Sequence, residues 1–508
     1  MNDSKSAGVD RVSIKAIKII SPYITKPLEH IINKSLIEGI FPEHLKKAEV
    51  IPVFKSGEDK KATNYRPISL ISNFAKIYEK ILKDRINSFI TKHDIINYYQ
   101  FGFQKGKNTE GAIKIVTDQI CEAIDDNIPC ISIFLDLAKA FDTVNHKILL
   151  EKLYNYGFRG TAQKIIESYL SNRKQVVKIN DTTSDELTIT CGVPQGTILG
   201  PILFILYIND LFEILSQGEL ISFADDTCLI VKGNSWIESQ IKAELKLNLI
   251  KNWLNKNYLS LNVNKTVFIT YGSYLDSVPQ NITLKVHTNS CSDNKCDCPC
   301  VNRVTVAKYL GVYIDYNLKW REHIRYITNK VRYLIYVFYK LNSVISKKQL
   351  MTMYYALFWT ISTYGIIAWG GAYENTLKSL NEIQKKILKL IHKKNRTFST
   401  ETLYREEKII TIRKYFLEKS LIDNFSNIKT KFQELLEKGK RNKRVTPPNY
   451  KKDISRHNHY FISFRIFNLL REDIKISDIN KKRNKKLIRD WIIDINTDIV
   501  KSFFKAHL

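Results

Sequence analysis

One short stretch of this sequence limits strongly how the chain can fold: residues 220–231, LISFADDTCLIV. Two apolar runs, residues 220–224 and 228–231, have the composition and length of buried strands, and the polar pair Asp225–Asp226 between them predicts a tight hairpin. Two adjacent carboxylates at the tip of a buried hairpin repel each other and lose hydration, which a nearby divalent cation would offset. The stretch alone leaves two interpretations open, a solvated turn and a metal site.

A third carboxylate strengthens the metal interpretation. Residues 131–137, ISIFLDL, predict another apolar strand, which carries Asp136 near its C-terminal edge, where binding sites are commonly built. Residues 139–146 are expected to continue as a helix. Three aspartates at the ends of two strands have the donors to hold two Mg²⁺ ions, an arrangement that proteins use to transfer phosphoryl groups.

Three motifs in a fixed order make the pattern specific. They are FLDLAKAFDTVNHKIL around Asp136, GVPQGTILGPILFILYINDL from Gly192, and FADD. In this order they resemble motifs A, B and C of a reverse transcriptase, in the version found in non-LTR (LINE-type) retrotransposons of the jockey kind. The resemblance implies an α+β right-hand polymerase fold with fingers, palm and thumb, followed by a helical C-terminal extension.

The resemblance also implies an activity. An RNA-directed DNA polymerase extends a primer 3′-hydroxyl with dNTPs by two-metal phosphoryl transfer, using two Mg²⁺ ions, for which Mn²⁺ can substitute. The expected partners are an RNA template, a DNA primer and dNTP. The chain starts almost at the stretch that precedes the fingers, so the endonuclease domain of intact elements is expected to be absent. The alternative function is a non-catalytic nucleic-acid-binding remnant of such a polymerase.

Composition agrees with a polyanionic partner. The 508 residues include 79 Lys and Arg against 51 Asp and Glu, a formal net charge of +28. A basic solvated surface, or a compositional bias toward Lys, Asn and Ile, explains the excess equally well. The polar N-terminus and the scattered cysteines of the apolar segments predict an intracellular protein, nuclear or cytoplasmic and not secreted. Residues 349–373 are uncharged, but their Thr, Ser, Tyr and Gly content favours buried helices over a membrane span.

The motif order predicts four regions. We expect fingers over residues 1–127, a palm with motifs A to E over 128–320, a helical thumb over 321–394 and a basic helical C-terminal region over 395–508. Apolar residues at helical spacing predict helices over 235–258, 321–342 and 377–391. A basic, Pro-bearing linker is expected at 438–448.

Several residues acquire roles from the resemblance. Lys55 and Arg66 lie on segments that resemble the fingers hairpin and would bind the triphosphate of the nucleotide, although they could also be ordinary surface cations. Phe141, five residues after Asp136, would pack under the sugar and exclude a 2′-hydroxyl, unless it is plain core. Gln195 and Gly196 would contact the base pair, since glycine allows close backbone approach.

Two later motifs complete the expected site. Lys265 matches the lysine of motif D and could protonate the departing pyrophosphate, or it could be a solvated lysine at the start of a strand. Residues 306–320 resemble motif E, the primer grip, with Leu310 and Gly311 in its turn. Cys291, Cys296, Cys298 and Cys300 form C-x4-C-x-C-x-C, which leaves a structural zinc site and a variable hairpin tip open, because a single intervening residue strains a chelate turn.

Overall fold

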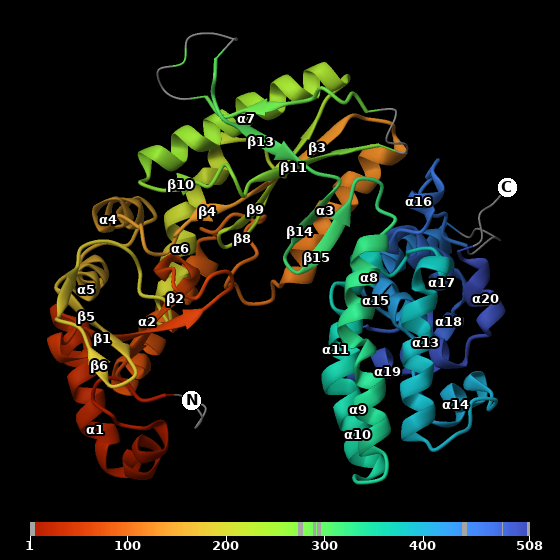
Figure 1. Ribbon diagram of the computed structural model, residues 1–508, viewed down its shortest axis with the longest axis horizontal. Helices are drawn as coiled ribbons and strands as arrows, with labels where there is room; N and C mark the ends of the chain where they lie inside the picture. The colour runs from red at the N-terminus through yellow and green to blue at the C-terminus, as the bar shows by residue number, and fades with distance from the viewer. Residues whose placement is uncertain are drawn as a thin grey trace.

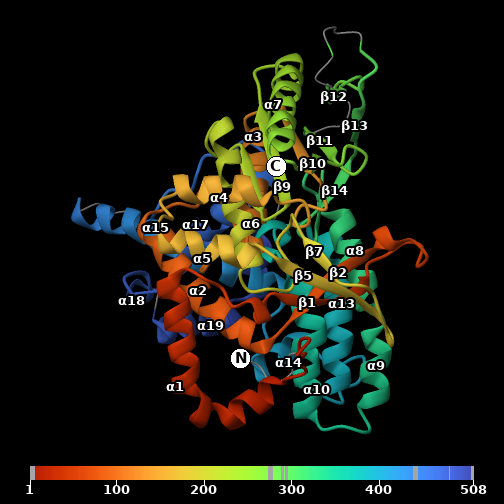
Figure 2. The same ribbon diagram turned by 90° about the vertical axis from the view of Figure 1, so that its left-hand side faces the viewer.

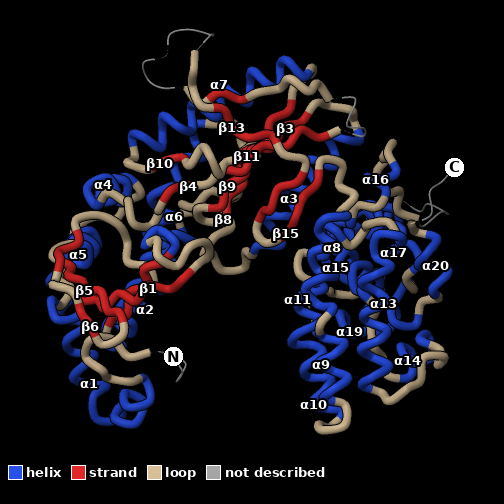
Figure 3. The backbone as a smooth tube through the Cα atoms, in the orientation of Figure 1, coloured by secondary structure: helices blue, strands red, loops and turns tan. Residues whose placement is uncertain are grey.

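The computed structural model describes residues 6–272, 278–287, 291, 296–438, 444–479 and 481–504. Figure 1 shows two bodies joined by a bridge. The N-terminal segments form one body, the thumb and C-terminal helices form the other, and a β-sheet with its covering helices joins them across the top. Figure 3 shows that the strands gather in the first body and the bridge, while the C-terminal body is helical.

The bridge is built on a six-stranded sheet with the order β12-β13-β11-β3-β9-β8. Its central strand β3 is buried at all six positions and pairs antiparallel with both β9 and β11. The strands are β3 (Cys130–Leu135), β8 (Leu220–Phe223), β9 (Asp226–Lys232), β11 (Val267–Tyr271), β12 (Leu284–Lys285) and β13 (Cys300–Arg303).

The two faces of this sheet belong to two separate cores, because successive side chains of a strand point to opposite faces. Cys130 and Phe134 pack with helix α3 (Thr109–Asp125) and with the thumb. Ile131, Ile133 and Leu135 pack with helices α6 (Gly200–Ile208) and α7 (Trp236–Lys256). Both faces of β3 are therefore covered, which is why its sequence is a continuous apolar run rather than an alternating one.

The fingers contain a second sheet with the order β2-β1-β5-β6, and β7 also pairs with β5. Strand β5 runs parallel to β1, so residues from beyond motif A join the sheet that the N-terminal segment begins. Its strands are β1 (Lys47–Phe54), β2 (Tyr65–Ile71), β5 (Arg173–Ile179), β6 (Thr182–Thr183) and β7 (Leu187–Ile189). The surrounding helices are α1 (Ile14–Glu38), α2 (Asn73–Lys92), α4 (His146–Asn155) and α5 (Thr161–Leu170).

The thumb and the C-terminal region share one apolar core with the underside of the palm sheet. A small hairpin, β14 (Val306–Tyr309) and β15 (Val312–Asp315), leads into them. The larger helices are α8 (Arg321–Arg332), α9 (Leu334–Leu341), α10 (Lys347–Met353), α13 (Glu374–Ile391), α15 (Ile412–Glu437), α17 (His459–Leu469) and α19 (Lys482–Asp494). Shorter elements connect them: the π-helix Tyr354–Trp359, α11 (Thr360–Thr363), α12 (Ile366–Trp369), α14 (Thr400–Glu406), α16 (Asp453–Arg456), α18 (Glu472–Lys475) and α20 (Thr497–Ser502).

Some local predictions are wrong in instructive ways. Residues 139–145 form turns instead of a helix: Lys139 has a φ of +49°, and helix α4 begins only at His146, where the Asn145 side chain accepts a hydrogen bond from the Ile148 N–H at 3.1 Å. The predicted helix over 321–342 is two helices that meet at Tyr333. Of the predicted linker, residues 439–443 lie outside the described residues.

Helix α7 forms as predicted, but it presents a different face to the sheet. Ala243, Leu247, Ile250 and Leu254 are buried. The sequence predicted a stripe of five apolar residues at helical spacing: Ile237, Ile241, Leu245, Leu249 and Trp253. Four of them are exposed, Ile237 at 73% and Leu245 at 62%, and Trp253 is buried. Apolar spacing predicts a helix, but it does not determine which of two apolar faces the tertiary structure covers. Over the part of the chain that the structure describes, we find no helix with both the length and the apolar character that a membrane crossing requires.

Candidate active site

The three predicted aspartates converge at one end of strands β3, β8 and β9. The β3–β9 ladder ends where Leu135 pairs with Thr227, so Asp136 follows directly, and Phe223 pairs with Asp226 across the β8–β9 hairpin. The two-residue tip is therefore Ala224 and Asp225, one position before the predicted Asp225–Asp226 pair. Ala224 has a φ of +59°, which is the left-handed conformation that two-residue hairpins need.

The carboxyl groups influence one another electrostatically. Burial is the main cause that raises the pKa of Asp225, and the charge of Asp136 raises it further. Burial, then Asp225 and Asp136, raise the pKa of Asp226 to about 6. Partly desolvated carboxylates that repel one another are oxygen donors for hard divalent cations, and such an ion would offset their repulsion. The residues present therefore fit magnesium.

Two cations of the fingers lie near this acidic group. Lys55 follows β1 directly and donates its N–H to the Asn64 carbonyl at 2.9 Å, while Arg66 lies on β2 opposite Val53. Both side chains are exposed. Their charges lower the pKa of Asp225 and of Asp226, against the effect of burial. The two cations therefore lie near enough to the carboxylates to act on them electrostatically.

The turn that carries Lys265 is bonded to the backbone of Asp136. The Asn262 N–H donates to the Asp136 carbonyl at 2.8 Å, and the Asp136 N–H donates to the Thr266 hydroxyl at 3.2 Å. The Lys265 N–H closes the turn onto the Asn262 carbonyl at 3.2 Å. The Lys265 side chain is exposed. The hydrogen bonds of this turn hold the Lys265 backbone beside that of Asp136, which is a candidate catalytic residue.

Phe141 is a half-buried aromatic that is stacked on the core. Its ring lies 4.2 Å from that of Phe204 with an interplanar angle of 24°, and 6.4 Å from that of Phe103. One face of the ring is thus supported by helix α6. Phe141 is half-buried and follows Asp136 by five residues. Its position is therefore compatible with both predicted roles, packing in the core and contact with the sugar of the nucleotide.

Gln195 and Gly196 pack against the fingers. The Gln195 side-chain amide donates to the Asp142 carboxylate at 2.9 Å, and the Gln195 carbonyl accepts from the Ser69 N–H at 2.7 Å. Gly196 has a φ of +107°, and a Cβ there would lie 2.8 Å from the Ser69 carbonyl oxygen. Glycine is needed at this position because Ser69 of strand β2 lies so close. This requirement does not depend on any contact with a base pair.

The sequence matches a known protein family. Residues 55–314, just over half of the chain, match the family model described as reverse transcriptase (RNA-dependent DNA polymerase). The chain belongs to the reverse transcriptase family. The matched residues include both cations, the three aspartates, Lys265 and the Leu310–Gly311 pair.

Curated relatives agree with the predicted subgroup, the non-LTR retrotransposons of the jockey kind. In Drosophila melanogaster, a probable RNA-directed DNA polymerase from transposon BS is 26% identical over 80% of this chain and 45% of the relative. The RNA-directed DNA polymerase from mobile element jockey, of the same organism, is also 26% identical, over 85% of this chain and 46% of the relative. The chain thus spans about half the length of these relatives. The predicted resemblance and the right-hand polymerase fold are confirmed.

Among solved structures, an apo telomerase from Candida tropicalis covers 99% of this chain and 76% of its own, at 13% identity and a TM-score of 0.40. This likeness is too low to support any further argument.

A residue that sequence reasoning missed supports the hairpin that carries Asp225. Gln100 is fully buried, and its side-chain oxygen accepts from the N–H groups of Ala224 at 2.9 Å and Gly102 at 2.8 Å. A Cβ on Gly102 would lie 2.4 Å from the Ala224 nitrogen. The glycines of residues 100–106, QFGFQKG, predict either a turn or a close approach of the backbone to the template. The close approach exists, but it is to the hairpin that carries Asp225.

The Leu310–Gly311 pair lies in the turn between β14 and β15, as predicted. Both residues have positive φ, +45° and +86°, as a two-residue hairpin of this kind requires. The Leu310 carbonyl accepts a hydrogen bond from the Tyr364 hydroxyl at 2.7 Å, and the Tyr364 oxygen also lies within hydrogen-bond distance of the Thr109 hydroxyl, at 2.9 Å. Tyr364 therefore links the turn to the start of helix α3.

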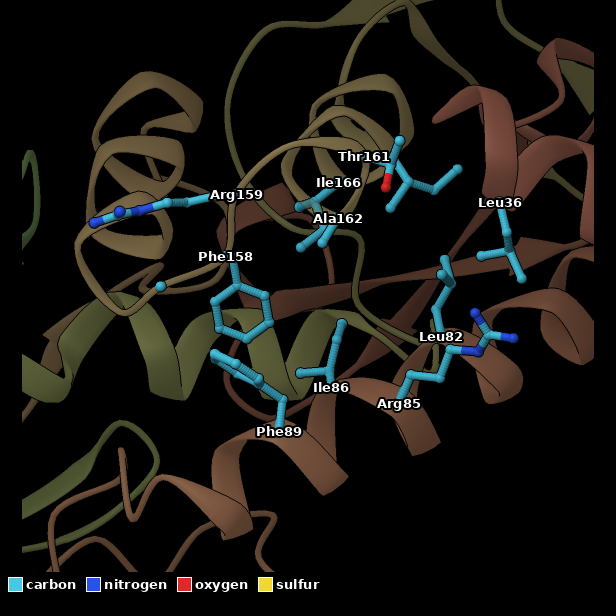
Figure 4. Close-up of a pocket in the computed structure, with 12 residues that line it drawn as sticks. Leu36, Leu82, Arg85, Ile86, Phe89, Phe158, Arg159, Thr161, Ala162 and Ile166 are labelled. Carbon is cyan, nitrogen blue, oxygen red and sulfur yellow. The ribbon is translucent and has the colours of Figure 1, made fainter.

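A well-formed pocket of about 290 Å³ lies elsewhere, between helices α1, α2 and α5. Figure 4 shows Leu82, Ile86 and Phe89 facing Phe158, Ala162 and Ile166 across it. Its lining is mainly apolar and includes none of the predicted site residues. This pocket is therefore separate from the candidate site around the three aspartates.

Proposed function

We propose that this protein is an RNA-directed DNA polymerase that extends a primer 3′-hydroxyl with dNTPs. The observation that carries the proposal is the meeting of Asp136, Asp225 and Asp226 at one strand end, with Lys55 and Arg66 close enough to alter the pKa of the last two. The family match and the names of the relatives support the same chemistry.

The three aspartates would hold two Mg²⁺ ions, with Mn²⁺ as a substitute. When bound, these ions lower the pKa of the attacking hydroxyl and offset charge on the phosphates. Asp136 and Asp225 would hold the ion that acts on the primer 3′-hydroxyl, Asp136 would also hold the ion that acts on the leaving group, and Asp226 would support the pair. Lys55 and Arg66 bind the triphosphate, Arg66 as a two-pronged donor and Lys55 as a point charge. Lys265 donates a proton to the departing pyrophosphate.

Recognition of the nucleotide and of the duplex falls to the surrounding residues. Phe141 lies under the sugar and disfavours a 2′-hydroxyl, while Gln195 and Gly196 support the nascent base pair. The Leu310–Gly311 turn positions the primer end. RNA template and DNA primer would run along the thumb, where Tyr333, between α8 and α9, and Tyr336 and Tyr339 of α9 are exposed at 59%, 64% and 64% and offer faces for stacking.

The same proposal assigns the four regions as fingers, palm, thumb and C-terminal helices with borders near residues 127, 320 and 394. Two segments cross these borders in packing: α3 contacts β8, β9 and β11 of the palm sheet, and β5 extends the fingers sheet. The four regions therefore divide the sequence, but the packing between elements extends across their borders.

A primer-extension assay on poly(rA) with oligo(dT) tests the function. Wild-type protein should incorporate dTTP with Mg²⁺ or Mn²⁺, and Asp225→Asn should not, although it should still bind the primer–template. Circular dichroism and melting curves of both proteins control for folding. Binding without extension by the wild-type protein, with either metal, would favour the alternative of a non-catalytic nucleic-acid-binding remnant.

A further inference from the structure

A second cluster of potential metal ligands lies outside the site described above. His287, Cys291, Cys296 and Cys298 bring one ligand atom each within 4.8 Å of all the others. His287 Nδ1 lies 3.5 Å from Cys291 Sγ and 3.2 Å from Cys296 Sγ. In a tetrahedral zinc site, with bonds of about 2.0 Å to nitrogen and about 2.3 Å to sulfur, such a pair lies about 3.5 Å apart. We propose that these four residues hold one structural zinc ion.

The donor chemistry selects the metal. Three thiolates and one imidazole form a soft donor set, which prefers zinc to magnesium or calcium. The cysteine spacing left this site undecided because Cys296 and Cys298 are separated by one residue. His287 precedes Cys291 by four positions and gives that pair the wider spacing that zinc ligands usually have. Cys296 and Cys298 keep their single intervening residue, and the fold nevertheless brings both thiols within 4.8 Å of the other two ligand atoms.

Helix α7 orients the histidine. The Glu244 carboxylate lies 2.8 Å from His287 Nε2, which leaves Nδ1 to face the thiols. Asn248 accepts from the His287 N–H at 2.8 Å, and Lys251 donates to the His287 carbonyl. A carboxylate on the far nitrogen of a ligating histidine is the usual outer partner in zinc sites, because it fixes the tautomer and raises the basicity of the ring.

The strands bring the cysteines back to the histidine. Strand β12 pairs with β13, and the Val286 N–H donates to the Pro299 carbonyl at 2.9 Å. Lys285 donates to the Cys296 carbonyl at 2.9 Å. Figure 2 shows β12 and β13 at the same end of the molecule as α7. A bound ion would therefore tie the tip of this hairpin to α7.

Cys300 provides a matched control. It lies in β13 opposite Lys285, it is exposed, and it is not part of the cluster. The four-cysteine set that the sequence presented is thus replaced by three of its members and one histidine.

The test is the metal content of the full chain, purified with a reducing agent and without chelator. Plasma mass spectrometry should find about one zinc per chain in the wild type. Cys296→Ser and Cys298→Ser should lose it, and Cys300→Ser should keep it. In competition with a chromogenic chelator, Glu244→Ala should bind zinc about 10- to 100-fold more weakly.

Cobalt provides a second readout that does not depend on variants that fold poorly. Replacement of zinc by Co²⁺ in the wild type and in Cys300→Ser should give thiolate-to-cobalt absorption and the intense visible bands of tetrahedral geometry. Absence of these bands together with absence of zinc would overturn the proposal. So would equal zinc loss in Cys300→Ser and Cys296→Ser, or cystine-linked peptides among these cysteines in protein kept reduced.

Discussion

The palm sheet has potential metal ligands near both of its edges, and the two groups differ in nearly every physical respect. Strand β8, next to Asp225 and Asp226, is one edge, and strand β12, next to His287, is the other. The first group offers only carboxylate oxygens, whereas the second offers sulfur and imidazole nitrogen. The ligand atoms of the second group all lie within 4.8 Å of one another. The oxygens of the three aspartates, which the structure also describes, do not meet this limit and are therefore spread more widely.

The difference follows from what each group has to do. A closed site for one ion can be built from a short loop and one helix, because four donors around a single centre are sufficient. A site that moves phosphoryl groups must leave space for substrate oxygens between its carboxylates. Strand register then sets the spacing: Asp136 follows the pair Leu135–Thr227, and Asp226 is paired with Phe223. Wide spacing and mutual repulsion distinguish the candidate catalytic group from the candidate structural one.

The largest expected effect would separate the two groups. Asp136→Asn should lower primer extension by about 10³-fold or more, because a metal contact is worth several kcal/mol to the transition state. Its zinc content should stay unchanged. Binding of Mg²⁺ to the aspartates is expected to raise the melting temperature of the wild type. Conversely, Cys296→Ser should lose zinc but keep this rise. Asp181→Asn, in an exposed turn of the fingers, is the matched control. Loss of both properties in either variant would mean that the two groups are coupled.

Nucleotide selection gives the next largest effect. Phe141→Ala should reduce the preference for dTTP over UTP by about 10- to 100-fold, because the sugar no longer meets a ring held by Phe204. Single-nucleotide incorporation with each substrate measures the ratio of kcat/KM values. Phe103→Ala removes a neighbouring ring that lies 6.4 Å away. Unchanged selectivity for Phe141→Ala, or an equal loss in both variants, would leave Phe141 as core.

Support of the catalytic hairpin should be a smaller effect. Gln100→Ala removes the acceptor for two buried N–H groups, at about 1–3 kcal/mol, and should lower kcat about tenfold. The KM for dNTP should change little, because Gln100 positions Asp225 rather than the nucleotide. Gln119→Ala is the control, since Gln119 donates to the Gly218 carbonyl at the other end of the hairpin. A fall in kcat of the same size for Gln119→Ala would point to general loosening.

Titration of Asp226 should have the smallest effect. Its pKa is about 6 in the folded protein, above the ordinary 3.8, so the folded state binds the proton more tightly than the unfolded state. Without added magnesium, the contribution of Asp226 to the free energy of unfolding should therefore fall as pH rises from about 4 to about 6. Asp226→Asn should raise the melting temperature by about 1–3 °C at pH 8 and not at pH 4. A gain of the same size at pH 4 would exclude this cause.

Much of the fold could be predicted from local patterns. The apolar run of β3, the hairpin around Asp225 and the buried face of α13 (Leu377, Leu380, Ile383, Ile387 and Ile391) lie where the sequence predicted them. The three aspartates were predicted from strand ends and motif order, and Lys55 and Arg66 from the resemblance to the family. The roles of these and the other site residues stay predictions until the assays are done.

What could not be predicted depends on contacts between distant segments. The face of α7 that is buried depends on the sheet beneath it, since both of its faces are apolar. No sequence pattern marks Gln100 as a supporting residue, because its role depends on a contact with Ala224, 124 positions later in the chain. Gly102 is the neighbouring residue whose type reflects the close approach of the hairpin. Residues 139–145 have helical composition, but the Asn145 cap and the turn at Lys139 delay the helix to His146.

By itself, the sequence determined the acidic pair, the order of the motifs and hence the family, because these depend on residue types at fixed local spacing. Only the tertiary structure decided that His287 joins three of the four cysteines and that Gln100 holds the hairpin. The physical reason is that a ligand set or a hydrogen-bond acceptor is defined by distance in space. Glu244 turning the His287 ring toward the cysteines, across 43 positions of the chain, is such a contact.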